Sequence, residues 1–197
     1  FKVGRGVLIP RDDTEVVVNL CIDFLKNRTD KKTVDLCSGS GAIAVALDKI
    51  SGAKVTAVEI DETAFSYLET NVKENNSSVK PVMADALEIC ETFADGELDL
   101  IVSNPPYIKS ADIETLQKEV RLEPRLALDG GEDGYDFYRE IVNRWSRKLK
   151  KGGALAFELG ENQADAVKAL MTDKGFSDFK ISLDFGGVQR AIIGTLL

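Results

Sequence analysis

The four residues Asn104-Pro105-Pro106-Tyr107 carry the strongest chemical signal in the sequence. Adjacent prolines fix the backbone, so the Asn104 side chain and the Pro105 carbonyl group would be held rigidly. Their two oxygens can each accept one N–H hydrogen of an amide or exocyclic amine nitrogen and orient that nitrogen for in-line attack. Tyr107 can stack on the planar group and exclude water. We therefore predict that Asn104, Pro105 and Tyr107 are catalytic and that all four residues bind substrate, although Asn-Pro-Pro can also simply end a strand.

A glycine-containing loop runs from Asp35 to Gly41 (DLCSGSG) and follows a short β-branched stretch. Gly39 and Gly41 allow a sharp strand-to-helix turn and let a ligand approach the backbone. Glu59 ends the next expected strand, near the spacing of about 20 residues typical of a carboxylate that binds a ribose. Both an NAD site and an S-adenosylmethionine site fit this pattern.

Two further acids favour S-adenosylmethionine over NAD. Asp35 precedes the turn, where a carboxylate would repel a pyrophosphate but attract the ammonium group of a methionine moiety. Asp85 follows the third expected strand and can accept a hydrogen bond from an adenine amino group. We predict that S-adenosylmethionine, and its product S-adenosylhomocysteine, bind to Asp35, Cys37, Ser38, Gly39, Ser40, Gly41, Glu59, Ile60, Asp85, Ala86 and Asn104.

Strand-like and helix-like segments alternate along the chain and would position these residues. Strands are expected at 33–36, 54–59, 79–83, 98–103, 154–158, 179–183 and 190–197, and helices at 41–48, 63–74, 135–149 and 163–171. A further helix is expected to start at Asp12, which forms a capping-box-like pattern with Glu15. The alternation predicts an α/β, Rossmann-like fold with a seven-stranded, mostly parallel sheet and one antiparallel strand from a C-terminal hairpin. The irregular stretch 108–134 falls where such a sheet keeps a substrate loop.

Composition excludes several classes of function. The chain has 197 residues, a formal net charge of −8, three cysteines and no histidine. Without histidine there can be no Ser-His-Asp triad and no histidine-ligated metal, and we expect no metal site. The cysteines are widely spaced without a CxxC pair, which predicts free thiols in a reducing cytoplasm. The sequence contains neither an apolar run of membrane-spanning length nor a secretory signal, so we expect no membrane association.

The charged residues bear on possible macromolecular partners. The negative net charge argues against binding nucleic acid by phosphate neutralisation alone. A basic cluster could contact RNA or an acidic protein, but we favour a role in complementing a helix dipole; it contains Arg139, Arg144, Arg147, Lys148, Lys150 and Lys151. A second group fits either a loop ion-pair network or the lining of a substrate entrance, and it contains Glu119, Arg121, Glu123 and Arg125.

The tetrapeptide after the fourth strand of a glycine-loop domain resembles the amino-group-directed methyltransferases. Within these, essentially the whole chain resembles the release factor glutamine methyltransferases (the HemK/PrmC family). The segments that carry this resemblance are 1–3, 8–11, 14–15, 119–120, 123–124, 127–128, 130–131, 133–134, 157–160 with Gln163, and 184–190. Cys37 stands where the family commonly has glycine. Because cysteine, unlike glycine, disfavours positive φ, we expect an ordinary φ at this position.

The resemblance implies a class I S-adenosylmethionine-dependent methyltransferase that acts in translation termination. It implies methylation of the side-chain amide of the glutamine in the Gly-Gly-Gln motif of a peptide chain release factor, which is then the protein partner. We expect residues 1–197 to form this domain, with a leading segment and helix at 1–30 and the sheet core at 31–197. The family's N-terminal helical domain is expected to be absent from this chain, so that cofactor binding survives while substrate affinity suffers.

Further expectations concern partners and rival functions. We expect no stable binding of nucleic acid, and we favour a monomer. The alternative is a nucleic-acid methyltransferase acting on the exocyclic amine of adenine or guanine, which would flip a base into the pocket and require a basic groove. A non-catalytic binding module is a third possibility, but such a scaffold has no need of the Asn104–Tyr107 residue types.

Overall fold

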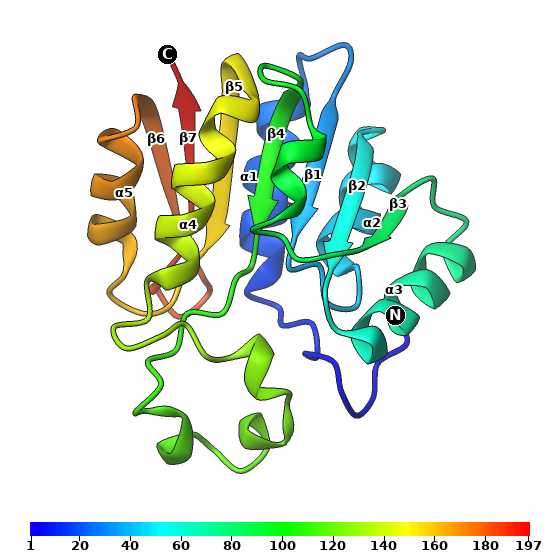
Figure 1. The fold of residues 1–197 in the computed structure, drawn as a ribbon, viewed down its shortest axis with the longest axis vertical. Helices are drawn as coiled ribbons and strands as arrows, with labels where there is room; N and C mark the ends of the chain where they lie inside the picture. Colours follow the sequence, from blue (N-terminus) through cyan, green and yellow to red (C-terminus); the bar gives the residue numbers. More distant parts are fainter.

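The computed structural model describes residues 1–197, which fold around one seven-stranded sheet (Figure 1). The strand order is β3-β2-β1-β4-β5-β7-β6. The strands are β1 (Lys32–Leu36), β2 (Lys54–Glu59), β3 (Lys80–Met83), β4 (Leu98–Ser103), β5 (Leu149–Glu158), β6 (Phe176–Leu183) and β7 (Gln189–Leu196). Neighbours from β3 to β5 pair in parallel, whereas β7 runs antiparallel to both β5 and β6. The prediction of a mostly parallel sheet with one antiparallel strand is confirmed.

Five helices cover the two faces of the sheet (Figure 1). They are α1 (Thr14–Leu25), α2 (Ala42–Ser51), α3 (Glu62–Glu74), α4 (Asp136–Trp145) and α5 (Ala164–Thr172). Alternate residues of β4 face opposite layers, as the two-residue period of a strand requires. Val102 packs with α1 and α2, while Ile101 packs with α4 and α5. None of these helices combines the length and the apolar composition needed to cross a bilayer.

Several expected boundaries differ from the structure: β5 begins at Leu149 rather than at 154, α2 extends to Ser51 rather than 48, and α1 and α4 depart as follows. Helix α1 begins at Thr14, and Asp13 at its N-cap makes no side-chain capping hydrogen bond, so the predicted capping box is wrong. Asp13 is itself helical, with φ −60° and ψ −28°, and its carboxylate lies 3.4 Å from Arg190. The helix expected at 135–149 ends at Trp145 as an α-helix, because a 3₁₀ turn at Ser146–Lys148 leads the chain directly into β5.

The stretch 108–134 is irregular, as predicted, and lies at the carboxyl end of the sheet (Figure 1). It contains short 3₁₀ turns at Ile113–Thr115, Val120–Leu122 and Arg125–Ala127. A parallel bridge between Ile108 and Asp129 brings its two ends together. The three cysteines are unpaired, and Cys21 and Cys90 are buried.

Candidate functional site

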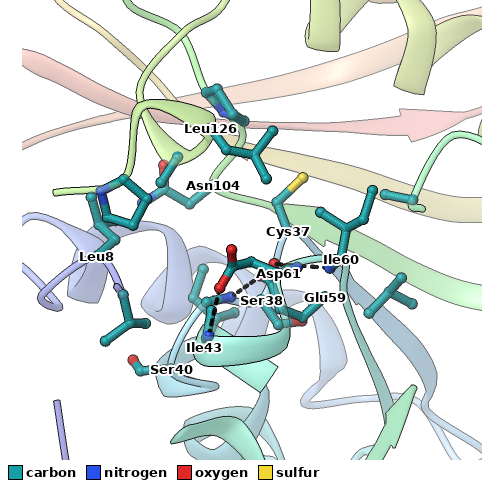
Figure 2. Close-up of a pocket in the computed structure, with 18 of the residues that line it drawn as sticks. Leu8, Cys37, Ser38, Ser40, Ile43, Glu59, Ile60, Asp61, Asn104 and Leu126 are labelled. Carbon is teal, nitrogen blue, oxygen red and sulfur yellow. Dashed lines mark hydrogen bonds between the residues drawn. The ribbon is translucent and has the colours of Figure 1, made fainter. Parts of the chain in front are cut away.

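A cavity lies over the carboxyl ends of the strands, where ligands bind in α/β folds (Figure 2). It is lined by the leading segment, the glycine loop with the start of α2, the turns after β2 and β3, the tetrapeptide after β4, residues 124 and 126–127, and Phe137 of α4. Among the predicted site residues, those that line it are Cys37, Ser38, Gly39, Ser40, Glu59, Ile60, Asp85, Ala86, Asn104 and Pro106. Asp35, Gly41, Pro105 and Tyr107 lie behind this lining, and Figure 2 shows Asn104 and Glu59 reaching the cavity from different strands.

The glycine loop takes a left-handed backbone at alternate positions, Cys37, Gly39 and Gly41. Gly41, at the N-cap of α2, has φ +83°, and a Cβ there would lie 2.5 Å from Cδ1 of Leu68. Gly39 has φ +55°, and a Cβ there would meet no atom within 4 Å. Gly41 is therefore required for packing against α3, whereas Gly39 leaves open space beside the cavity.

Cys37 departs from the expectation of an ordinary backbone. Its φ is +58°, in the left-handed region that favours glycine. The chain leaves β1 and must turn at once, and the Ser38 N–H donates to the Val58 carbonyl oxygen at 3.0 Å, which holds this turn against β2. The expectation of a negative φ is therefore wrong. Cys37 shares with Gly39 and Gly41 the conformation needed to turn the loop toward the cavity.

Glu59 joins the glycine loop to the turn after β2. Its Oε2 accepts the Gly39 N–H at 2.8 Å, and its Oε1 accepts the N–H groups of Ile60 and Asp61, each at 2.8 Å (Figure 2). Asp61 in turn caps α3 through the N–H groups of Thr63 and Ala64. The carboxylate of Glu59 is thus buried, accepts a hydrogen bond at each oxygen, and is held at the edge of the cavity with acceptor capacity left on Oε2.

Asp35 has the opposite environment. Its side chain is completely buried beneath the loop, and neither carboxylate oxygen has a hydrogen-bond partner. Burial raises the pKa of this carboxyl to about 7, since removal from water disfavours the charged form. A cationic group beside this carboxyl would stabilise its ionised form.

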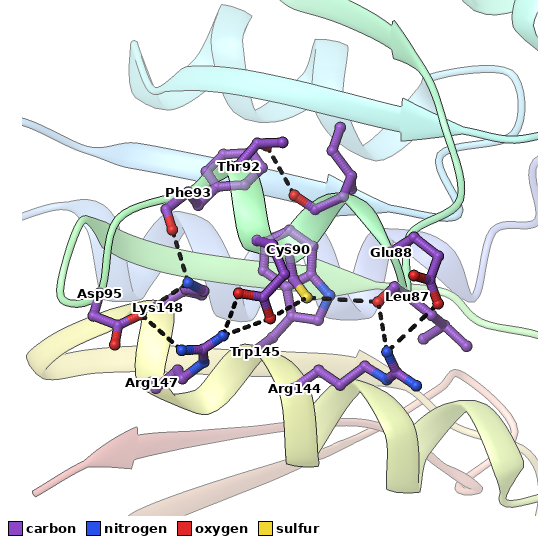
Figure 3. Close-up of polar contacts among 12 residues, drawn as sticks. Leu87, Glu88, Cys90, Thr92, Phe93, Asp95, Arg144, Trp145, Arg147 and Lys148 are labelled. Atoms are coloured by element: carbon purple, nitrogen blue, oxygen red, sulfur yellow. Dashed lines mark hydrogen bonds and ion pairs between the residues drawn. The ribbon is translucent and has the colours of Figure 1, made fainter.

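The segment after β3 carries Asp85 and Ala86, and Figure 3 shows the next residue, Leu87, in contact with Arg144 of α4. Asp85 Oδ1 accepts the Leu87 N–H at 2.7 Å, which forms the turn. Trp145 Nε1 donates to the Ala86 carbonyl oxygen at 2.8 Å, and Arg144 Nη1 donates to that of Leu87 at 3.2 Å. Trp145 is completely buried, and its indole N–H holds this edge of the cavity in place.

The basic cluster is neutralised by acids. Its paired members contact nearby carboxylates, and the pairs are Arg139 with Asp133 and Asp136, Arg144 with Glu140, Arg147 with Glu91, Lys148 with Asp95, and Lys150 with Asp99. Arg144 lies in the last turn of α4, where it can complement the helix dipole as predicted, and ion pairs with acids account for Arg147, Lys148 and Lys150 beyond Trp145.

The tetrapeptide follows β4 and divides between the cavity and the layer behind it. Asn104 is half-buried and lines the cavity with Pro106. Tyr107 turns away, because its carbonyl oxygen accepts a hydrogen bond from Gln163 Nε2 at 3.1 Å and its ring packs on Gly160. Burial raises the pKa of the Tyr107 phenol to about 12. The structure therefore places Asn104 in reach of a ligand and places the Tyr107 ring behind the lining.

The leading segment covers the cavity, which the sequence patterns did not predict. Gly6, Val7, Leu8, Pro10 and Thr14 line it. Arg11 makes a two-pronged pair with Glu123, with N···O distances of 2.8 and 3.0 Å, which ties this segment to the 108–134 region. Within the charged group at 119–125, Glu123 therefore pairs with Arg11 of the leading segment, and Arg125 pairs with Asp129. Residues 6–10 carry no chemical motif, and the resemblance to the family marked only 1–3, 8–11 and 14–15 of this segment, not Gly6 or Val7.

Comparison with known proteins identifies the family. The model of the Methyltransferase small domain family matches residues 11–123. A release factor glutamine methyltransferase of Geobacter sulfurreducens is 42% identical over 100% of this chain and 68% of its own length. One from Fusobacterium nucleatum is 39% identical over 98% of this chain, which spans 55% of that relative. The chain belongs to the release factor glutamine methyltransferase family.

Solved structures share the fold of this release factor glutamine methyltransferase family member. A methyltransferase from Pyrococcus furiosus aligns with a TM-score of 0.67 at 24% identity, over 90% of this chain and 82% of that one. The N-terminal domain of human METTL16 in complex with S-adenosylhomocysteine aligns with a TM-score of 0.69 at 17% identity, over 97% and 73%. The chain therefore has the class I methyltransferase fold, and the cofactor of its family is S-adenosylmethionine.

The residues at the site fit this cofactor. The buried, unpartnered carboxyl of Asp35 would complement a methionine ammonium group, and the open space beside Gly39 leaves room for a ligand against the backbone. Glu59 presents a carboxylate to the cavity, suited to ribose hydroxyl groups, and Asp85 lies beside the apolar Ala86 and Leu87, suited to an adenine. The donor set therefore fits a cationic nucleoside.

Proposed function

We propose that this chain transfers a methyl group from S-adenosylmethionine to a glutamine side-chain amide nitrogen of a peptide chain release factor, in its Gly-Gly-Gln motif. The observation that carries this proposal is the position of Asn104. It follows a buried strand, is held by two prolines, and lines the same cavity as Gly39, Glu59 and Asp85. Sequence similarity to release factor glutamine methyltransferases, over 98–100% of this chain and 68–69% of those relatives, supports the choice of substrate.

The chain's own groups would orient the nucleophile. Asn104 Oδ1 and the Pro105 carbonyl oxygen each accept one N–H hydrogen of the substrate amide, which aims its nitrogen lone pair. The buried prolines keep both acceptors rigid. When bound, the cofactor supplies a methyl group on a positively charged sulfur. Because the cofactor activates the methyl group, the nitrogen need not lose a proton before it attacks, which agrees with the absence of histidine.

The structure does not favour the nucleic-acid alternative. A base-flipping enzyme requires a basic groove beside its pocket. In this chain the basic cluster lies at the end of α4, where its arginines pair with acids. The similarity to METTL16 is a similarity of fold, at 17% identity.

A methyl-transfer assay tests the proposed function. Labelled S-adenosylmethionine is offered with a release factor, with the same factor carrying Gln→Ala in its Gly-Gly-Gln motif, and with DNA or RNA. We expect label on the unmodified release factor alone. Label on nucleic acid alone, or equal labelling of the Gln→Ala factor, would contradict the proposal.

A further inference from the structure

Glu158, the last residue of β5, is a buried acid for which the reaction scheme above has no use. Its exposure is 3%, and its Oε2 has no hydrogen-bond partner. Burial raises the pKa of this carboxyl to about 7. A buried polar atom without a partner costs stability, so its retention calls for an explanation.

The register of the sheet places Glu158 beside Asn104. Ser103 of β4 pairs with Phe157 of β5 in the parallel ladder, so Asn104 and Glu158 follow adjacent strand ends. Side chains alternate along a strand, and both residues therefore leave the sheet on the side of Val102 and Ala156, which pack with α1. Thr14, in the first turn of α1, lies on this side, and the hydroxyl of Thr14 and the amide of Asn104 act on the Glu158 carboxyl, although burial dominates its pKa.

An asparagine amide needs a second contact to face the right way. Its Oδ1 and Nδ2 have nearly the same shape, and only Oδ1 can accept the substrate N–H. We propose that Glu158 is a positioning residue: its carboxylate accepts an N–H of Asn104 Nδ2 and so directs Oδ1 toward the substrate nitrogen. This inference rests on the proposed function for its meaning, but the Asn104–Glu158 contact can be observed without turnover.

The protonation state of Glu158 would control this contact. A carboxylate can only accept, whereas a protonated carboxyl can donate its O–H to Asn104 Oδ1 and compete with the substrate. The charged and titratable groups that act on Glu158 are Asp13, Arg190, Arg11, Tyr107 and Tyr138. Both arginines have other carboxylate partners, since Arg190 contacts Asp184 at 2.8 Å and Arg11 pairs with Glu123. Neither arginine therefore neutralises Glu158 outright.

Turnover measurements on variants give the first test. At saturating S-adenosylmethionine, we expect kcat of the unmodified chain to fall as pH decreases through about 7. Glu158→Leu should lower kcat on the order of 10- to 100-fold, the scale of one charge-assisted hydrogen bond, with the cofactor Kd unchanged. Glu158→Gln keeps an acceptor, so it should retain most activity but lose the fall below pH 7. The matched control is Glu161→Gln, at an exposed position three residues further on, which should behave like the unmodified chain.

The outcomes are decisive for the inference. Unchanged kcat in folded Glu158→Leu, or a persistent acid limb in Glu158→Gln, would overturn it. NMR of the Asn104 side-chain amide gives a readout that needs no turnover. Its ¹⁵N–¹H signals should shift with a midpoint near pH 7 in the unmodified chain and in Glu161→Gln, but not in Glu158→Gln. Asn104 signals that do not change with pH in any of the three proteins would refute the contact. The expected titration in a protein that shows no methyl transfer would refute only the proposed function.

Discussion

The strand ends of β2 and β3 differ from those of β1 and β5 in how their acids are hydrogen-bonded. At the first group, Glu59 accepts three backbone N–H groups, and Asp85 accepts one. At the second group, Asp35 and Glu158 are buried, and three of their four carboxylate oxygens have no hydrogen-bond partner. The acids of the first group line the cavity and already accept backbone hydrogen bonds, whereas Asp35 and Glu158 are not among the residues that line it.

This difference distinguishes acids that stabilise the fold from acids that are suited to contact a ligand or a reacting group. A carboxylate with backbone donors stabilises the loop that it binds, so ligand binding and folding favour the same ionised state. A buried carboxyl without donors is stable in its neutral form and becomes useful as an anion only beside a cation or a donor. The two groups of strand ends should therefore respond to substitution with opposite signs.

Asn104→Ala should have the largest effect, because it removes an acceptor aimed at the reacting nitrogen. We expect turnover to fall on the order of 10²- to 10³-fold. The binding free energy of the cofactor should change by less than about 1–2 kcal/mol, the scale of one hydrogen bond. Single-turnover methylation and calorimetric titration of the cofactor measure the two effects. Turnover equal to that of the unmodified chain would contradict the role of Asn104.

Asp35→Asn should stabilise the cofactor-free protein at pH 8. The pKa of Asp35 is raised from 3.8 to about 7 by burial, so the folded state binds more protons than the unfolded state between these values. The free energy of unfolding of the unmodified chain therefore falls as pH rises from about 4 to about 7, by up to about 4 kcal/mol for this group. The amide has no such loss.

Urea unfolding at pH 5 and pH 8 without cofactor measures the Asp35→Asn effect. The variant should gain stability over the unmodified chain at pH 8 and lose most of that gain at pH 5, where Asp35 is already neutral in the fold. The same substitution should weaken cofactor binding, because the neutral amide cannot pair with an ammonium group. A variant less stable at pH 8 would show that the buried carboxyl is satisfied after all.

Glu59→Gln should have the opposite sign. One carboxylate oxygen becomes an NH₂ group that faces a backbone N–H donor from Gly39 or from Ile60 and Asp61. We expect the free energy of unfolding to fall by about 2–3 kcal/mol, because a buried hydrogen bond to a charged group is lost. Denaturant unfolding at pH 7 beside Asp35→Asn provides the comparison, and a gain of stability in both variants would remove the distinction between the two groups of strand ends.

Trp145→Phe should have the smallest effect and tests the anchoring of the segment after β3. The substitution removes the indole N–H that donates to the Ala86 carbonyl oxygen, while most of the contact with Phe93 remains. We expect a loss of about 1–2 kcal/mol in unfolding free energy and a few-fold weaker cofactor binding. Thermal unfolding and cofactor titration measure these changes, and a cofactor affinity that stays constant would show that this segment needs no anchor.

Much of the fold could be predicted because the strands are fully apolar or β-branched and the helices begin after clear turns. The bounds of β2 and β4 were predicted without error, and Asn104 was placed at the end of β4. The left-handed backbone at Cys37 was missed, because a non-glycine residue in this conformation depends on contacts with β2 rather than on its own type. Glu158 received no site role, since nothing near it in the sequence marks it as a partner of Asn104.

The sequence by itself determined the order of strands and helices, the glycine loop and the residue types at the carboxyl ends of the strands. These follow from local periodicity and turn chemistry, which act over a few residues. Only the tertiary structure decided which acids are satisfied. Glu59 accepts backbone N–H groups because the glycine loop folds over it. Asp35 and Glu158 are buried with carboxylate oxygens that have no hydrogen-bond partner. Burial and pairing come from residues far apart in the chain, and no local pattern encodes them.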